Sequence, residues 1–249
     1  MRVQELWRYP VKSLQGERLD EANLTADGID GDRRYAIVDL DTGLGLTGRR
    51  VPELLFASAS LTADGGVSII LPDGTVADGD EMLSDWLGRR VALRRAEENV
   101  GGRYEDVIDF EREQTSAWKT FDGAPGPFHD SPRARVSLVS TGTIGAWDPR
   151  RFRANILLDE NREDALVGSS IALGEAVLHI EGHIQRCVMV TRPQPGGIDR
   201  DLDGAAEDRA RARSPPRSRR ARQPPRHRSR RRSTSTANHG ARAERRGQR

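Results

Sequence analysis

Cys187 is the only cysteine among the 249 residues of this chain, and it follows Arg186 directly. A single thiol forms no disulfide within the chain, so it is either a small buried apolar side chain or a reactive or metal-binding group. A turn-rich Pro-Gln-Pro-Gly-Gly stretch follows at 193–197. The choice between these two interpretations decides what chemistry the thiol can do.

Cationic and hydroxyl side chains gather beside several predicted turns. Lys12 and Ser13 follow Pro10 at the end of the first predicted strand, and such a lysine by itself is usually a solvated turn residue. Arg33 opens another strand, and a turn at 46–48 leads into a further pair of arginines. Paired arginines are usually surface groups, yet a guanidinium also clamps phosphate well because it offers two parallel donors. These clusters therefore leave a surface role and an anion site both open.

Three later features have a structural and a functional interpretation. Ser140 precedes a predicted helix, where its hydroxyl either caps the helix or helps to hold an anion, and capping is favoured on this segment alone. Arg153 and Asn155 are two positions apart in a predicted strand, which puts both on one face, as on the wet side of a sheet. His179 and His183 are four apart, but the sequence around His179 predicts a strand, which disfavours a metal site there.

Short strands separated by glycine-rich turns must position these residues, at a spacing typical of sheets or a barrel rather than of alternating βα units. The predicted strands are Val3–Tyr9, Glu17–Leu24, Arg34–Leu40, Ala57–Leu61, Val67–Leu71, Val136–Ser140, Ala154–Leu158, Ala176–Ile180 and Cys187–Thr191. Residues 80–87 predict a short helix with one apolar face, which we expect to cover a sheet opening or edge. The stretch 122–132 has the composition of a loop, so we divide the ordered part of the chain there.

The charge is unevenly distributed along the chain. Residues 1–203 contain 24 basic and 35 acidic residues, whereas residues 204–249 contain 16 Arg, no Lys and 3 acidic residues. The second segment has alanine and proline as its only apolar side chains, so it cannot offset an ordering entropy of roughly 1–2 kcal/mol per residue. We predict that residues 204–249 are disordered.

Composition also limits the location and the partners. No stretch approaches the roughly 20 apolar residues of a membrane span, and the N-terminus has no continuous apolar segment, so we expect no membrane association. With no internal disulfide, a cytoplasmic location is the default. The arginines of the tail can neutralise phosphates in a salt-dependent manner, but the tail has no aromatic residue to stack on bases. Any nucleic-acid binding is therefore expected to be nonspecific.

Taken together and in this order, the clusters resemble the MOSC family, named after the C-terminal domain of molybdenum cofactor sulfurase, with its N-terminal β-barrel subdomain. The matching signatures are Tyr-Pro-Val-Lys-Ser at 9–13, Gly-Asp-Arg-Arg-Tyr at 31–35, Leu-Thr-Gly-Arg at 46–49, Phe-Arg-Ala-Asn-Ile at 152–156 and Arg-Cys at 186–187. None is specific alone, but five in register over about 190 residues are a strong match. The resemblance implies a β-rich α+β fold: a β-barrel subdomain and connection at 1–121, a C-terminally incomplete, β-barrel-like MOSC core at 122–203, and a basic tail at 204–249.

The resemblance further implies a molybdopterin-type molybdenum cofactor whose metal is ligated by Cys187. The residues that it places around the cofactor are Lys12, Ser13, Arg33 and Arg153, with Thr47, Ser140 and Asn155 as neighbours. A thiolate is a soft donor that suits this metal, and Arg186 beside it favours the ionised form. The implied reaction, as in the amidoxime-reducing members, is a two-electron reduction of N-hydroxylated small molecules.

The same resemblance bears on partners and leaves alternatives. One cysteine cannot hold a four-cysteine iron–sulfur cluster, so a separate flavin or ferredoxin-type electron donor is implied. MOSC domains also occur beside a pyridoxal-phosphate-dependent desulfurase domain, so sulfur carriage or cofactor binding without turnover is an alternative. Lys12 and Lys119 are the only two lysines, and we do not expect pyridoxal phosphate on this chain.

A third alternative is an inactive relic. Family members continue with an ordered closing segment, whereas after Asp203 this sequence turns into Arg, Pro, Ser and Ala. Out-of-frame translation of a GC-rich gene produces such a composition, which leads to the hypothesis of a frameshift near Asp203. An incomplete domain leaves strand edges unpaired, and an open cofactor pocket would follow.

Overall fold

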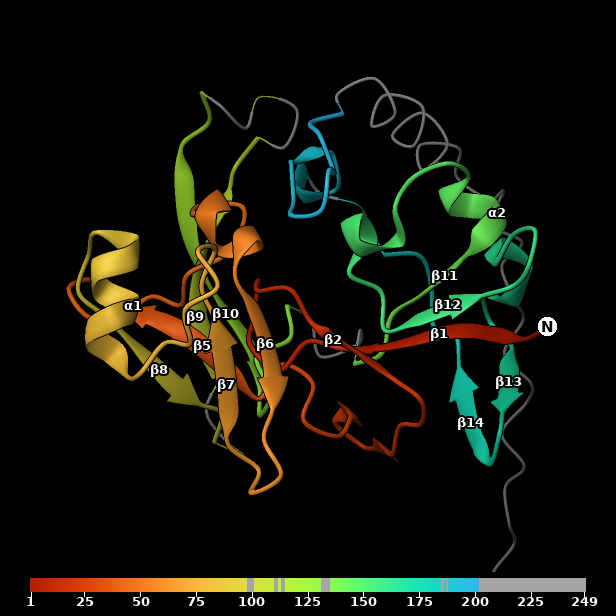
Figure 1. The fold of residues 1–249 in the computed structure, drawn as a ribbon. Helices are drawn as coiled ribbons and strands as arrows, with labels where there is room; N and C mark the ends of the chain where they lie inside the picture. The colour runs from red at the N-terminus through yellow and green to blue at the C-terminus, as the bar shows by residue number, and fades with distance from the viewer. Residues whose placement is uncertain are drawn as a thin grey trace, which may run out of the picture. The chain divides into compact units, whose positions relative to one another are not determined.

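The first strand of the chain pairs with strands from both halves of the sequence. In the computed structural model, β1 (Val3–Arg8) lies antiparallel to β2 (Glu17–Leu19) and β12 (Ile156–Leu158), while β12 runs parallel to β11 (Leu138–Ser140) (Figure 1). The order in this four-stranded sheet is β11-β12-β1-β2. The N-terminal motif that follows β1 is thereby held against the segment that precedes β12.

The structure describes residues 1–97, 101–109, 112, 115–130, 135–184, 186 and 188–201, all within one compact unit. The described residues do not include Cys187 or the tail at 204–249, which the sequence predicts to be disordered. They also do not include Asp203, near which a frameshift is hypothesised. Within them, no helix combines the length and the apolar character that crossing a membrane requires.

The other described strands form two-stranded antiparallel ladders. These are β3 (Leu24–Thr25) with β4 (Gly28–Ile29), β5 (Tyr35–Asp39) with β8 (Val91–Arg95), β6 (Ser58–Leu61) with β7 (Val67–Ile70), β9 (Gly101–Val107) with β10 (Trp118–Pro125), and β13 (Ser170–Leu173) with β14 (Ala176–His179). Isolated bridges join Val11 to Tyr35 and Gln15 to Ser58, so the loop after β1 is fixed to two of these ladders. The β-rich class predicted from the sequence is confirmed.

The predicted helix is present with the predicted bounds. Helix α1 (Asp80–Leu87) buries Leu83 in the largest apolar core and lays the side chains of Met82 and Trp86 against it. Two acidic residues in the first turn of α1 interact favourably with the positive end of the helix dipole. Gly88 ends the helix in the left-handed conformation, with a φ of 62°. Helix α1 packs along β8, which confirms that it covers an edge of the strand ladders (Figure 1).

Two strand predictions around the candidate site are wrong. Residues 188–191 form a 3-10 helix, η4 (Val188–Thr191), rather than part of a strand. Arg153 is not in a strand beside Asn155, because it caps a second 3-10 helix, η2 (Pro149–Phe152), with φ of 49°, and β12 begins only at residue 156. Arg153 and Asn155 therefore do not share one face of a strand.

The stretch 122–132 begins in a strand rather than in a loop. Residues 122–125 complete β10, where they pair with the start of β9 across a register irregularity. Both strands contain Gly and charged residues, which have low strand propensity, so sequence patterns do not reveal them. Burial of Tyr104 and Val107 from β9 outweighs that propensity.

A second apolar core underlies the β11–β12 part of the sheet, where a glycine allows close approach of two segments. Helix α2 (Thr141–Ile144) contributes Ile144 to this core, and a Cβ on Gly142 would lie only 1.7 Å from the carbonyl oxygen of Asn161.

Because the neighbour of Gly142 is backbone, we expect Gly142→Ala to lower the free energy of unfolding by about 2 kcal/mol. Urea unfolding measures this, with Gly182→Ala as the control, since nothing lies within 4 Å of a Cβ there. Equal stabilities of the two variants would contradict the close packing.

Candidate functional site

Three of the predicted site residues share an unusual backbone conformation. Ser13, Arg33 and Arg153 have φ values of 71°, 51° and 49°, and they are the non-glycine residues with positive φ in the described part of the chain. A left-handed L-residue costs roughly 1–2 kcal/mol and persists only where the surroundings hold it. Such strain is typical of positions at which side-chain direction matters more than stability.

The two strained arginines lie on the ring of Tyr9. The guanidinium carbon of Arg153 is 4.4 Å from the ring centroid, and that of Arg33 is 5.4 Å away. Arg153 also donates to the carbonyl of Leu14, while Arg33 pairs with the buried carboxylate of Asp32. Burial lowers the pKa of Arg153 to about 10 and raises that of Tyr9 to about 12, so at neutral pH both arginines are cationic and the phenol is neutral.

Lys12 is the third cation and is not the solvated turn residue that its type favours. Its side chain is 5% exposed, and its Nζ lies 4.4 Å from the ring centroid of Tyr104. The ammonium donates to the carbonyl of Phe128 at 3.0 Å and to the carboxylate of Asp130. Burial lowers the pKa of Lys12, and Asp130 opposes this shift. We call Lys12, Arg33 and Arg153 the cationic cluster.

The turn at 46–49 contacts the cluster through Ser13. The hydroxyl of Ser13 accepts a hydrogen bond from the backbone N–H of Gly48 at 2.9 Å, which places Thr47 beside it in the chain. Arg49 forms an ion pair with Asp106 on β9. The structure thus brings together four predicted residues, Lys12, Ser13, Arg33 and Arg153, and sets Thr47 at their margin.

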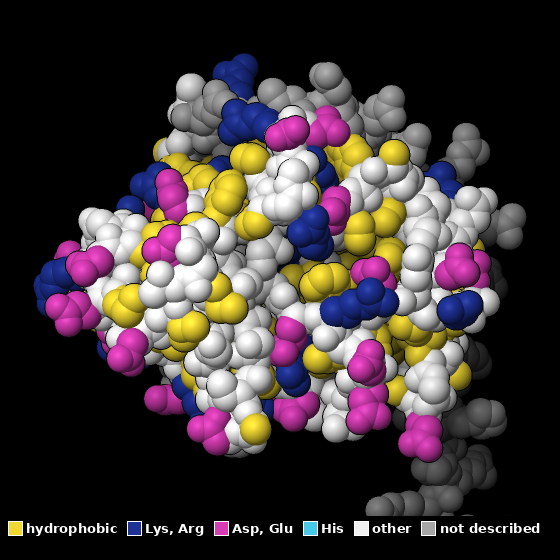
Figure 2. Space-filling model, viewed as in Figure 1, with side chains coloured by type: hydrophobic (Ala, Val, Ile, Leu, Met, Phe, Trp, Pro, Cys, Tyr) yellow, Lys and Arg dark blue, Asp and Glu magenta, His cyan; other side chains and the backbone are white. Residues whose placement is uncertain are grey.

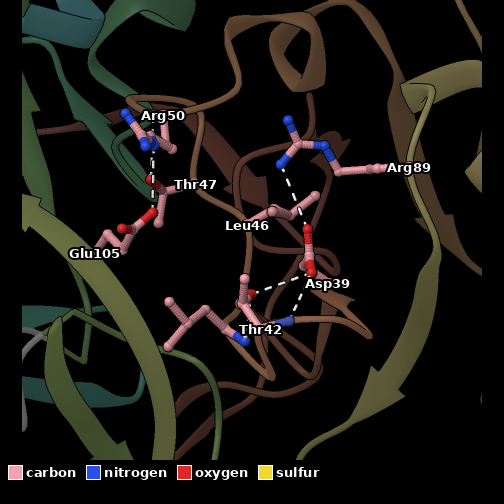
Figure 3. A pocket seen from close by; sticks show the side chains of 9 residues that line it. Asp39, Thr42, Leu46, Thr47, Arg50, Arg89 and Glu105 are labelled. Carbon is pink, nitrogen blue, oxygen red and sulfur yellow. Dashed lines mark hydrogen bonds and ion pairs between the residues drawn. The ribbon is translucent and has the colours of Figure 1, made fainter.

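Thr47 lines a cavity of about 420 Å³. Two ion pairs border it: Arg50 with Glu105 at 3.3 Å, and Arg89 with Asp39 at 3.5 Å (Figure 3). Gly45 forms part of the wall, and a Cβ there would lie 2.6 Å from the ring of Tyr104, so this ring backs the cavity wall. The cavity lining is balanced in charge, unlike the cationic cluster.

Ser140 and Asn155 are buried, but their hydrogen-bond partners belong to the four-stranded sheet and the segments beside it. Ser140 caps α2 by accepting from the N–H of Thr143, and it donates to the carboxylate of Glu163. The amide of Asn155 donates to the carbonyl of Trp7 and accepts from Ser137. The capping interpretation of Ser140 is confirmed, and a cofactor role for either residue stays a prediction.

The segment that follows Cys187 is fastened to both sides of the site. Arg151 of η2 donates to the carbonyls of Val190 at 3.1 Å and Asp199 at 2.6 Å. Gln194 accepts from Gln15 at 2.8 Å. On the other side of the cysteine, the guanidinium of Arg186 lies 5.2 Å from the ring centroid of Phe152, the residue before Arg153. Cys187 itself is outside the described residues, so its role as a metal ligand stays a prediction.

Sequence reasoning did not select the groups that hold the cluster in place. Tyr9 belongs to the motif at 9–13 and Asp32 to the motif at 31–35, so their closeness in sequence to Lys12 and Arg33 could have indicated a role in the site. Tyr104 and Asp130 lie far from Lys12 in the sequence, so no local pattern indicates that they contact it.

The two histidines at 179 and 183 contact different partners, Ser170 and Asp164. No group of three His, Cys, Asp or Glu suited to a metal occurs within the described ranges.

His129, next to Asp130, is a buried neutral histidine. Its Nε2 lies 3.1 Å from the carbonyl of Asp27, and burial lowers its pKa to about 4. An unfolded histidine has a pKa of about 6.5, so between these values only the unfolded state binds the proton. Stability is therefore expected to fall by about 3 kcal/mol as the pH drops from 6.5 to 4.

Urea unfolding at several pH values checks this expectation. His129→Gln should remove most of the pH dependence between 6.5 and 4, because the amide keeps a donor without titrating. His183→Gln, at an exposed position, should leave the slope as in the wild type. A wild-type slope in the His129 variant would show that other groups carry the effect.

On the face seen in Figure 2, basic and acidic side chains are interspersed rather than separated. The positive charges of the cationic cluster lie inside the protein instead, because Lys12 and Arg153 are buried. Converging cations with a hydroxyl are the donor set that binds phosphate and other anions.

Comparison with known proteins identifies the family. A family model described as the MOSC N-terminal beta barrel domain matches residues 1–95, and one described as the MOSC domain matches residues 99–226, more than half of the chain. The chain is also similar to the molybdenum cofactor sulfurase of Drosophila grimshawi, at 24% identity over 233 residues, covering 76% of this chain and 28% of that protein. It thus spans less than a third of the relative's length. This chain belongs to the MOSC domain family and begins with the MOSC N-terminal beta barrel domain.

Proposed function

We propose that this protein binds a molybdopterin-type molybdenum cofactor through the cationic cluster. The observation that carries the proposal is the convergence of three cations, two of them nine-tenths buried, around the rings of Tyr9 and Tyr104. A buried cation requires an anionic partner, because an uncompensated buried charge is strongly destabilising. Asp130 and Asp32 meet this need for Lys12 and Arg33, so the cluster is a place where the protein stabilises negative charge. The donor set fits the phosphate of a molybdopterin.

In this proposal the chain's own residues do the binding and orienting. Arg33 and Arg153 would grip the anionic group in bidentate fashion, Lys12 would neutralise it as a point charge, and the Ser13 hydroxyl would add a donor. The strained backbones at 13, 33 and 153 hold these groups in place before a ligand arrives, which reduces the cost of ordering on binding. Thr47, Ser140 and Asn155 are the proposed neighbours.

Cys187 is the proposed metal ligand. Arg186, whose guanidinium stacks on Phe152, favours its thiolate form. Arg151 holds two of the described residues that follow the thiol in the chain, because it donates to the carbonyls of Val190 and Asp199. When bound, the cofactor supplies two-electron redox chemistry at molybdenum.

The proposed activity is an oxidoreductase that reduces N-hydroxylated small molecules, with electrons from a separate flavin or ferredoxin-type donor. Support comes from the MOSC family and from the single cysteine. The test is to purify the chain without oxygen from a cofactor-producing host, measure molybdenum and pterin, and assay benzamidoxime reduction with reduced methyl viologen. Near-stoichiometric metal with turnover supports the proposal, whereas a folded chain without metal contradicts it.

A second candidate is sulfur or cofactor handling without turnover, which the name of the Drosophila relative favours. Here Cys187 would carry a persulfide rather than a metal. Release of thiocyanate on treatment with cyanide detects such sulfur. Cyanide-labile sulfur that disappears in Cys187→Ala, together with no reductase activity, would favour this function over the first.

A further inference from the structure

Asp130 is the carboxylate that engages Lys12 in this structure. The side chain of Lys12 is 5% exposed, whereas that of Asp130 is 76% exposed, so a buried ammonium is paired with a carboxylate that solvent reaches. The preceding residues are anchored: Phe128 donates its N–H to the carbonyl of Arg33, and His129 is buried. The chain is therefore anchored up to His129, and the next side chain, that of Asp130, is exposed and paired with the cation.

The carboxylate of Asp130 lies where the positive charges converge. Besides Lys12, the charges of Arg33 and Arg49 act on it, and it acts in turn on Arg153. The nearby carboxylate of Asp32 is buried and already engaged with one member of the cluster, since it accepts from the backbone N–H of Tyr9 and pairs with Arg33. Asp130 thus takes the position that an anionic ligand of the cluster would need.

We propose that Asp130 is a specificity-determining residue, whose carboxylate must be exchanged for the anionic group of the ligand and thereby selects dianions over monoanions. This inference rests on the proposed function of the cationic cluster. A buried ammonium cannot be left without a partner, so a ligand enters only by replacing the carboxylate. A tethered carboxylate competes at an effective concentration in the millimolar range or above. A free monoanion gains nothing over it, whereas a phosphate dianion attracts the surrounding cations more strongly.

The test titrates the full chain, without cofactor, with inorganic phosphate and with acetate at low salt by calorimetry. In Asp130→Asn we expect phosphate affinity to rise about tenfold, because a competing like charge is removed. We expect acetate to have no effect on phosphate binding by the wild type. In Asp130→Asn it should compete with phosphate by replacing the lost carboxylate.

Asp122→Asn is the matched control, because it removes the same charge from a side chain that is 83% exposed and pairs with Arg103 on β9. Its phosphate affinity should stay within about twofold of the wild type. Phosphate affinity in Asp130→Asn that is equal to or below the wild-type value, without acetate competition, would overturn the proposal.

If Asp130→Asn fails to fold, hydrogen exchange on the wild-type chain decides instead. Saturating phosphate should speed amide exchange in the peptide around Asp130 while slowing it around Lys12. Unchanged exchange at Asp130 overturns the proposal. A purified protein without molybdenum would contradict the proposed function but leave this phosphate titration as it is, so the two failures are distinguishable.

Discussion

Cys187→Ala is expected to lower the molybdenum content of the anaerobically purified protein by about tenfold or more, because it removes the proposed soft donor to the metal. The pterin content should fall less, since the proposed phosphate contacts to Lys12, Arg33 and Arg153 do not involve the thiol. Metal analysis and pterin fluorescence of the same samples separate these two effects.

The control for this experiment is Cys187→Ser, which keeps the size of the side chain but offers a harder oxygen donor. Because the chain has no other cysteine, neither substitution changes a disulfide. Circular dichroism and thermal unfolding should match the wild type. Full molybdenum content in the alanine variant would show that the metal is held without this thiol.

Asp32→Ala is expected to destabilise the fold by about 3–5 kcal/mol, because it leaves the buried charge of Arg33 without its partner. The carboxylate also accepts a hydrogen bond from the backbone N–H of Tyr9 at 2.8 Å, so the substitution leaves a second buried donor without its acceptor. Urea unfolding near pH 7 measures the change.

Asp30→Ala serves as the matched control two residues earlier. Its carboxylate is 57% exposed and pairs with Arg34 at 2.7 Å, an arrangement expected to contribute about 0.5 kcal/mol or less. A loss in Asp32→Ala that is within 1 kcal/mol of the loss in Asp30→Ala would contradict the assignment of Asp32 as the counter-ion of Arg33.

Much of the fold and part of the site follow from local patterns. Pro10 after the first strand and the apolar face of Asp80–Leu87 predict the ends and the type of these elements, because each depends on nearby residues. The order of the motifs around Lys12, Arg33 and Arg153 predicts the family. Strands β9 and β10 escape prediction because pairing and the burial of Tyr104 outweigh their glycines and charges.

The sequence by itself determined the β-rich class, the single thiol and the motif residues of the cluster, because these are properties of composition and short-range order. Only the tertiary structure decided which of them meet. It turned Arg153 inward through a left-handed backbone, committed Ser140 and Asn155 to the scaffold, and set Asp130 on Lys12. The positions of Lys12 and Arg153 depend on contacts between residues more than a hundred positions apart, Lys12 with Phe128 and Leu14 with Arg153, which no local pattern encodes.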